Sequence, residues 1–290
     1  MYGALRGLET FSQLVSFQFS GEDYSLSGVP WSISDAPRFT HRGLMVDTAR
    51  HFQPLASLRA IIDSLPYAKI NVLHWHLVDS QSFPFHSASN PKLWDGAYNA
   101  QSRYTHSDVT SIVEYARLRG VRVMPEFDMP GHAQSWCIGY PELCPSSTCT
   151  TPLDVSRNGT FDLIERLLGE CTGGTASVAG APSALFPEAM LHLGGDEVST
   201  DCWESTPRIA NVSAAWSTNA RGSRSPAGGR RSVARLLSLL RASSLCCSPA
   251  PALELPLSTA HQSQRFLAHA WTVAQEQRPQ CRRWVYALSS

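Results

Sequence analysis

The chain has 290 residues, of which 43% are hydrophobic and 17% charged, as is typical of a globular protein with one large or two ordinary domains. Its formal net charge of +0 argues against nucleic acid or a membrane surface as a partner. The charge is uneven, because residues 214–290 contain 10 Arg, no Lys and 2 Glu, a net +8, whereas residues 1–213 carry −8. No stretch approaches the roughly 18 apolar residues of a membrane helix, so we expect no membrane span.

Short β-like runs alternate with amphipathic helical stretches from residue 37 onward. This alternation is typical of a parallel sheet with crossover helices. Four βα units in a row fit either a doubly wound sheet or the first half of a (β/α)₈ barrel, and counting does not separate the two. The predicted order is strand Arg42–Thr48, helix Pro54–Lys69, strand Asn71–Asp79, helix Ser107–Arg119, strand Val121–Asp128, helix Phe161–Glu170 and strand Met190–Glu197.

The alternating pattern ends near residue 213. Residues 220–231 are rich in Arg, Ser and Gly, Leu236–Leu245 has the pattern of one helix, and residues 248–257 contain three prolines. We interpret residues 214–290 as a flexible basic tail with one or two helices. A nucleic-acid-binding tail is the alternative, but the tail lacks a pattern of aromatic residues interleaved with the basic ones.

The cysteines and glycosylation sequons favour an oxidising compartment. Five of the 8 cysteines lie within residues 137–202, and the two sequons are Asn158-Gly-Thr160 and Asn211-Val-Ser213. The first residues of the chain contain no apolar run of the secretory signal type. No targeting signal can therefore be read. From the cysteines and the sequons we expect the secretory pathway rather than the cytosol.

Each predicted strand ends in polar or ionisable residues. The carboxyl ends of parallel strands face one side of the molecule, so these side chains should converge on one mouth. The alternative is that each carboxylate simply caps a strand–helix junction. The residues concerned are Asp47, His76, Asp79, Glu126, Asp128, Asp196 and Glu197.

Carboxylates and histidines among many aromatic residues favour a sugar-binding site. The sequence has neither a nucleophile-elbow serine nor a glycine-rich phosphate loop, and aromatic faces stack on pyranose rings. A glycosidase needs one carboxylic acid with a raised pKa, and the neighbouring carboxylates Asp196 and Glu197 suit this because mutual repulsion raises one pKa. The aromatic residues are Trp75, Phe83, Phe85, Trp94, Trp136 and Trp203.

Metal-dependent hydrolysis is a competing hypothesis. His74 and His76 are two apart on a predicted strand, so both imidazoles face the same side and could share a metal ion. Two alternatives are interior histidines with satisfied hydrogen bonds and direct contacts to a sugar. Cys144 and Cys149 lack zinc-ribbon partners, so disulfides are favoured for them.

Five motifs in order resemble the β-N-acetylhexosaminidases, the family 20 glycoside hydrolases. The resemblance covers residues 3 to about 213. The motifs are GALRGLETF from Gly3, HRGLMVDTARH from His41, HWHLVD from His74, EFDMPGH from Glu126, and HLGGDEV from His192 followed by Cys202-Trp203.

The resemblance implies a fold, a domain organisation and a reaction. Residues 37–213 would be the first half of a catalytic (β/α)₈ TIM-type barrel, of which only four βα units are recognisable. Residues 1–36 would be a remnant of a preceding α/β domain with a linker, and residues 214–290 do not resemble the family. The implied activity is exo-hydrolysis of terminal β-linked N-acetylglucosamine or N-acetylgalactosamine from glycoconjugates, with retention of configuration and with no metal or organic cofactor.

The resemblance also implies roles for individual residues. Glu197 would be the general acid and base, and Asp196 would orient the acetamido group of the substrate, whose own oxygen attacks the anomeric carbon. Arg42 would donate to sugar hydroxyls. Asp79 and His132 would form a hydrogen-bonded chain that tunes Glu197.

The family further implies a disulfide and a cellular address. Cys202 would bridge to Cys149, with Cys144 as the second choice of partner. Glycosylation is expected at Asn158 and Asn211, the location is the lysosome or vacuole or outside the cell, and a homodimer is possible. The alternative function is a catalytically inactive or weakly sugar-binding fragment, because the second half of the barrel is not recognisable.

Overall fold

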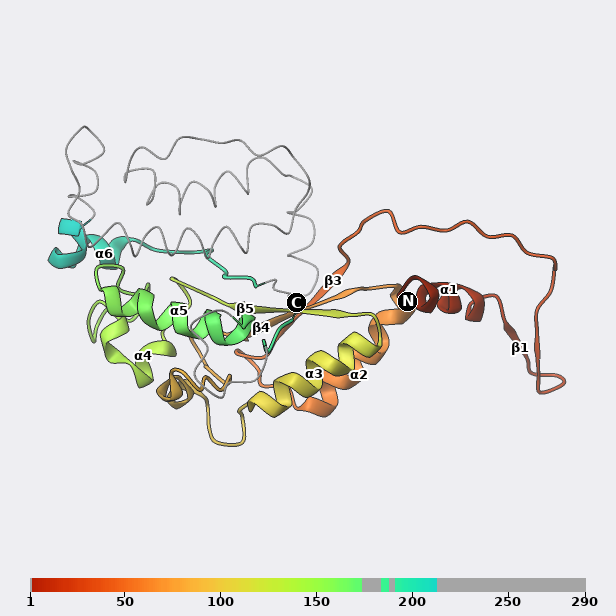
Figure 1. The fold of residues 1–290 in the computed structure, drawn as a ribbon, viewed down its shortest axis with the longest axis horizontal. Helices are drawn as coiled ribbons and strands as arrows, with labels where there is room; N and C mark the ends of the chain where they lie inside the picture. Colours follow the sequence, from red (N-terminus) through yellow and green to blue (C-terminus); the bar gives the residue numbers. More distant parts are fainter. Residues whose placement is uncertain (1, 174–183, 188–190, 213–290) are drawn as a thin grey trace, which may run out of the picture.

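A computed structural model describes residues 2–173, 184–187 and 191–212 (Figure 1). The tail predicted for residues 214–290, including the helix expected at Leu236–Leu245, lies outside the described residues. The described elements follow in the order α1 (Tyr2–Ser12), β1 (Ser16–Gln18), β2 (Asp23–Ser25), β3 (Gly43–Asp47), α2 (Leu55–Ser64), η1 (Leu65–Ala68), β4 (Val72–Val78), η2 (Pro91–Gly96), α3 (His106–Leu118), β5 (Arg122–Phe127), α4 (Trp136–Gly139), η3 (Pro141–Leu143), α5 (Asn158–Thr172) and α6 (Asp201–Glu204).

A parallel sheet of order β3-β4-β5 forms the centre of the structure. It confirms the first three predicted strands, and β4 is nearly all buried, as a strand covered on both faces must be. Helices α2 and α3 lie together along one side of the sheet (Figure 1). They contribute the buried Leu58, Ile62, Val109 and Ile112 to the core.

The fourth predicted strand, Met190–Glu197, is only partly borne out. Residues 188–190 lie outside the description, and the part from residue 191 pairs with β5 only through an isolated parallel bridge between Glu126 and His192. The chain turns away after two residues, because Gly194 and Gly195 have φ values of 64° and 97°, which do not belong to a strand. The described sheet is therefore an open, partial one and does not close into a barrel.

Two helix boundaries differ from the prediction for local reasons. The helix expected to reach Lys69 changes to 3₁₀ geometry after Ser64, where Pro66 has no amide hydrogen to donate to an α-helical hydrogen bond. Helix α5 is longer than predicted and is followed by Gly173, whose φ of 72° is typical of a C-terminal cap. Helix α3 begins after a capping box between Thr105 and Asp108.

The N-terminal helix α1 contacts the amino ends of the sheet. The Arg6 Nη2 donates to the carbonyl oxygens of Ile70 at 3.0 Å and Gly120 at 2.8 Å, just before β4 and β5. The β1–β2 hairpin is antiparallel and extends away from the sheet (Figure 1). Whether residues 1–36 are the remnant of a preceding domain stays a prediction.

A buried carboxylate attaches α5 to the long connection after β4. Glu170 accepts hydrogen bonds from the amides of Ala88 at 2.8 Å and Ser89 at 3.1 Å, and lies 2.6 Å from His106 Nε2. Burial opposes ionisation, but these donors prevail and lower the pKa of Glu170 to about 2. In the described residues, no helix is long and apolar enough to cross a membrane.

We expect Ile62→Ala to lower the free energy of unfolding by about 2–5 kcal/mol, because it leaves a cavity under α2. Ile62 is 0% exposed, whereas Ile138 in α4 is 58% exposed and provides a matched control. Urea unfolding followed by circular dichroism measures both variants. Equal effects of Ile62→Ala and Ile138→Ala would contradict the assignment of the core.

Candidate active site

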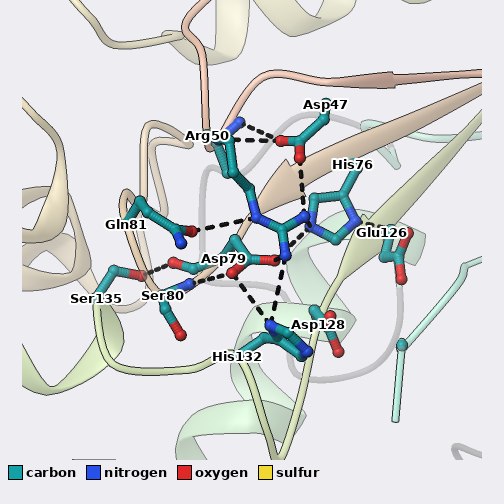
Figure 2. Close-up of polar contacts among 12 residues, drawn as sticks. Asp47, Arg50, His76, Asp79, Ser80, Gln81, Glu126, Asp128, His132 and Ser135 are labelled. Carbon is teal, nitrogen blue, oxygen red and sulfur yellow. Dashed lines mark hydrogen bonds and ion pairs between the residues drawn. The ribbon is translucent and has the colours of Figure 1, made fainter. Parts of the chain in front are cut away.

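The carboxyl ends of the strands carry a cluster of charged side chains (Figure 2). The register pairs Asp47 of β3 with His76 of β4, and His76 with Glu126 of β5. The bridge between Glu126 and His192 continues this row onto the next segment. Residues in register point to the same face, so the sheet places these four side chains side by side.

His76 is an imidazole held between two carboxylates. Its Nδ1 lies 2.8 Å from Glu126 Oε2 and its Nε2 lies 2.8 Å from Asp79 Oδ2. Both nitrogens donate only when the ring is protonated. Burial opposes that charge, but the two carboxylates outweigh it and raise the pKa of His76 to about 10.

Asp79 is fully buried and ionised. Burial alone would raise its pKa, but hydrogen bonds from His76 and the Ser80 amide, together with the charge of Arg50, lower it. Arg50 Nη2 lies 2.8 Å from Asp79 Oδ2, and Arg50 Nη1 lies 2.8 Å from Asp47 Oδ2 (Figure 2). Asp79 is thus a fixed negative charge at the base of the site.

His132 links Asp79 to the predicted general acid. Its Nδ1 lies 3.3 Å from Asp79 Oδ1 and its Nε2 lies 3.4 Å from Glu197 Oε2. His132 and Glu197 both have positive φ, 52° and 51°, which turns each away from its strand direction. The structure therefore places Asp79, His132 and Glu197 in contact, in the order that the resemblance implies for their hydrogen-bonded series.

The turn that carries Asp196 and Glu197 is packed against Asp128. The Gly195 amide donates to Asp128 Oδ1 at 3.1 Å. A Cβ atom on Gly194 would lie 1.7 Å from the same oxygen, so this position requires glycine. Burial, and then the charge of Glu126, raise the pKa of Asp128 to about 7. Carboxylate oxygens of Asp128 and Asp196 and a nitrogen of His132 lie within 4.8 Å of one another.

Arg42 does not join this cluster, which corrects the sequence-based assignment. It precedes β3 at its amino end, where Nε donates to the Lys69 carbonyl at 2.6 Å and Nη1 to the Phe39 carbonyl at 2.5 Å. The strand length separates it from the carboxyl-end site. Arg50, which the sequence reasoning missed, is the arginine of the site. Its position just after the strand that ends in Asp47 was the available signal.

Most of the aromatic residues expected near a sugar are core residues instead. Trp75, Phe83, Phe85 and Trp136 are all 0% exposed, so their faces cannot stack on a ligand. Trp94 and Trp203 are partly exposed. The aromatic composition of the sequence does not show which aromatic residues pack in the core and which are free to contact a ligand.

The His74–His76 pair has a partner that accounts for it. His74 Nε2 lies 2.5 Å from Glu126 Oε2, the same oxygen that His76 contacts. The spacing of His74, Glu126 and His192 would also suit a cation. Because the imidazoles already contact a carboxylate, the geometry favours satisfied interior histidines over a metal pair.

The chain after the turn is anchored to the loop that follows β5. Cys149 and Cys202 form a disulfide with a Cα–Cα distance of 5.9 Å, the first of the two pairings that the resemblance suggested. Trp203 Nε1 donates to the Leu153 carbonyl at 2.9 Å, and Arg208 Nη2 contacts Asp154 Oδ2 at 2.5 Å. A second disulfide joins Cys144, for which a disulfide was expected, to Cys137, a partner that was not predicted; Cys171 is buried and free.

Both predicted glycosylation asparagines are exposed. Asn158 is the first residue of α5, and the threonine of its sequon, Thr160, is buried and donates to the Asp154 carbonyl at 2.8 Å. Asn211 lies near the end of the described chain, and Ser213 of its sequon is outside the description. Glycosylation at either position stays a prediction.

Fold and site together define an α/β protein with its reactive groups at the carboxyl ends of parallel strands, where enzymes of this class bind their substrates. Residues 39–222 match the family described as "Glycosyl hydrolase family 20, catalytic domain". This chain therefore belongs to glycosyl hydrolase family 20.

Known proteins of this family are similar over most of the chain. "Beta-hexosaminidase 3" of Arabidopsis thaliana is 51% identical over 210 residues, which are 72% of this chain and 37% of that protein. "Beta-hexosaminidase subunit beta" of Felis catus is 45% identical over 210 residues, 72% of this chain and 38% of that protein. The X-ray structure of a Flavobacterium johnsoniae chitobiase matches with a TM-score of 0.66 and 33% identity, over 83% of this chain and 35% of that one. The chain thus spans less than two-fifths of these relatives.

The proton held by His76 predicts a pH dependence of stability. The pKa of His76 is about 10 in the folded protein against a usual 6.5, so the folded state keeps a proton that the unfolded chain releases. The free energy of unfolding should therefore fall as the pH rises from 7 to 10, and His76→Gln should reduce that fall. Urea unfolding across this pH range measures it, with His51→Gln, at an exposed histidine, as control. Equal slopes for His76→Gln and the parent would contradict the assignment.

Proposed function

We propose that this chain carries the acid–base part of an exo-acting β-N-acetylhexosaminidase site. The reaction would remove terminal β-linked N-acetylglucosamine or N-acetylgalactosamine from glycoconjugates, with retention of configuration. The observation that carries the proposal is the contact series from Asp79 through His132 to Glu197, beside the neighbouring carboxylate Asp196. Membership of family 20 supports the same reaction.

In the proposed mechanism, Glu197 donates its proton to the glycosidic oxygen as the bond to the anomeric carbon breaks. The acetamido oxygen of the substrate forms the new bond to that carbon, and Asp196 stabilises the positive charge that develops on the acetamido group. Glu197 then takes a proton from water, whose oxygen displaces the acetamido group. His132 orients Glu197 throughout, and the ionised Asp79 holds the His132 ring.

Arg50 takes the place that the resemblance gave to Arg42. Its guanidinium is held by Asp47 and Asp79 at the carboxyl end of the sheet, and 36% of its side chain is exposed. We propose that this exposed part donates to sugar hydroxyls, since guanidinium groups form directional hydrogen bonds to oxygen.

The sheet described here is best understood as part of a (β/α)₈ catalytic barrel. Support comes from the parallel β3-β4-β5 order, the bridge that adds His192 to β5, and the family 20 structure matched over 83% of this chain. Two disulfides agree with an oxidising compartment, so a lysosome, a vacuole or the outside of the cell is the proposed location. The homodimer stays a prediction.

One observation supports a second candidate, an inactive or weakly sugar-binding chain. The Glu197 side chain is 79% exposed, whereas a general acid is normally kept in a dry pocket that raises its pKa. For Glu197 to act as the general acid, additional protein surface would have to cover its side chain.

Hydrolysis of a chromogenic N-acetylglucosaminide tests the proposal. Glu197→Gln removes the transferable proton with little change in shape, so we expect a loss of rate on the order of 10²–10⁴-fold. Glu142→Gln, at an exposed glutamate of η3, should keep the parent rate. If the parent chain is no faster than Glu197→Gln, this chain is not the enzyme, and sugar binding by calorimetry then tests the second candidate.

A chelator distinguishes the proposed reaction from metal-dependent hydrolysis. The acid–base mechanism uses only side chains and the acetamido group of the substrate, so we expect the rate to be unchanged after dialysis against EDTA. Loss of the rate on chelation, and its recovery with Zn²⁺, would instead assign the His74–His76 pair to a metal.

A further inference from the structure

The segment that carries Asp196 and Glu197 has few backbone contacts with the sheet. The His192 amide donates to the Pro125 carbonyl at 2.9 Å, and the amides of Phe127 and Met129 donate to the carbonyls of His192 and Leu193, each at 3.0 Å. The chain then turns at Gly194 and Gly195. Three backbone hydrogen bonds would hold such a segment only loosely, so side chains must help to set its position.

Glu126 provides a side-chain contact at this point. Its Oε1 lies 2.9 Å from His192 Nδ1, while its Oε2 lies within 2.5 Å of His74 Nε2 and 2.8 Å of His76 Nδ1. One carboxylate of β5 therefore contacts imidazoles from β4 on one side and from the turn segment on the other. The proposed mechanism gives Glu126 no chemical step.

The position of the His192 ring is fixed from several directions. Its Nδ1 lies 2.9 Å from Glu126 Oε1 and 3.0 Å from the Gly194 amide nitrogen; when protonated, Nδ1 donates to Glu126 and does not accept from Gly194. Its ring also packs against the His74 ring, with a centroid distance of 4.8 Å and an interplanar angle of 35°. Because His192 lies two residues before Gly194, where the turn begins, the position of its ring helps to set where the turn leaves β5.

The charges around Glu126 support a strong contact. Its own burial opposes ionisation, yet His192, His74 and His76 together hold its pKa well below the usual range. In return, Glu126 raises the pKa of His192 against the effect of burial, with a further contribution from Asp128. Hydrogen bonds between charged partners are stronger than hydrogen bonds between neutral ones.

We propose that Glu126 is a positioning residue: through His192 it sets the point at which the acid-bearing turn leaves the sheet, and thereby the distance between Glu197 and His132. The catalytic meaning of this role rests on the proposed function. The positional role does not, and it can be measured without any activity.

Amide hydrogen exchange of the full 290-residue chain, followed by NMR, tests the positional role. Glu126→Gln keeps the side-chain shape but loses the charge. We expect the amides of Phe127, Met129 and His192 to exchange about tenfold faster or more, since the contact that keeps the segment on β5 is weakened. Amides of α2 and α3 should keep their rates. Glu114→Gln, at an exposed glutamate of α3, is the control.

Two outcomes would overturn the proposal. Unchanged exchange at Phe127, Met129 and His192 would show that Glu126 does not hold the segment. Equally faster exchange in α2 and α3 would show a general effect on stability instead of a positional one. If Glu126→Gln does not fold, His192→Gln breaks the same contact from the partly exposed side and must give the same local increase. Where both variants fold, the double variant should add little to either single one.

The hydrolysis assay extends the test to catalysis. With an active chain, Glu126→Gln should lower kcat about tenfold or more while KM changes little, because the substrate still binds but the acid is misplaced. Glu126→Asp, which keeps the charge, should recover part of kcat. An unchanged kcat in Glu126→Gln would refute the catalytic meaning. A parent chain without activity would refute only the proposed function, since the exchange result stands by itself.

Discussion

The parallel register of the sheet is the constraint on which the site depends. It aligns Asp47, His76 and Glu126 across β3, β4 and β5, and the bridge at His192 continues the alignment. Carboxylates and imidazoles alternate in this row, so the buried His76 and Glu126 each contact partners of opposite charge. Without such partners, burying these groups would cost several kcal/mol each. The same row holds Asp79 ionised, and Asp79 in turn positions His132.

Contacts on both sides hold the turn that carries Asp196 and Glu197. On its amino side, His192 contacts Glu126 and the Gly195 amide donates to Asp128. On its carboxyl side, the Cys149–Cys202 disulfide and the Trp203 hydrogen bond tie the chain to the loop after β5. That loop includes His132, which contacts Glu197. Both members of the His132–Glu197 contact are thus placed by one connected set of interactions.

The sequence predicted the first three strands well, because apolar runs bounded by turn residues have few alternatives. Asp79, His132 and Glu197, for which the resemblance predicts linked roles, also lie in contact in the structure. The role given to Arg42 does not fit the structure, because Arg42 precedes β3 at its amino end, whereas Arg50 follows the strand and contacts Asp79. The sequence-based expectation also failed for the buried aromatic residues, because packing and sugar stacking use the same residue types.

By itself, the sequence determined the order of the βα units, the family to which the chain belongs and the residue types at the strand ends. These properties depend on local periodicity and on motifs, which are written along the chain. Only the tertiary structure decided that Arg50 contacts both Asp47 and Asp79, that Glu126 contacts three imidazoles and that the fourth strand is reduced to a bridge. Those outcomes depend on strand register and on charge pairing between segments far apart in the chain, which no local pattern contains.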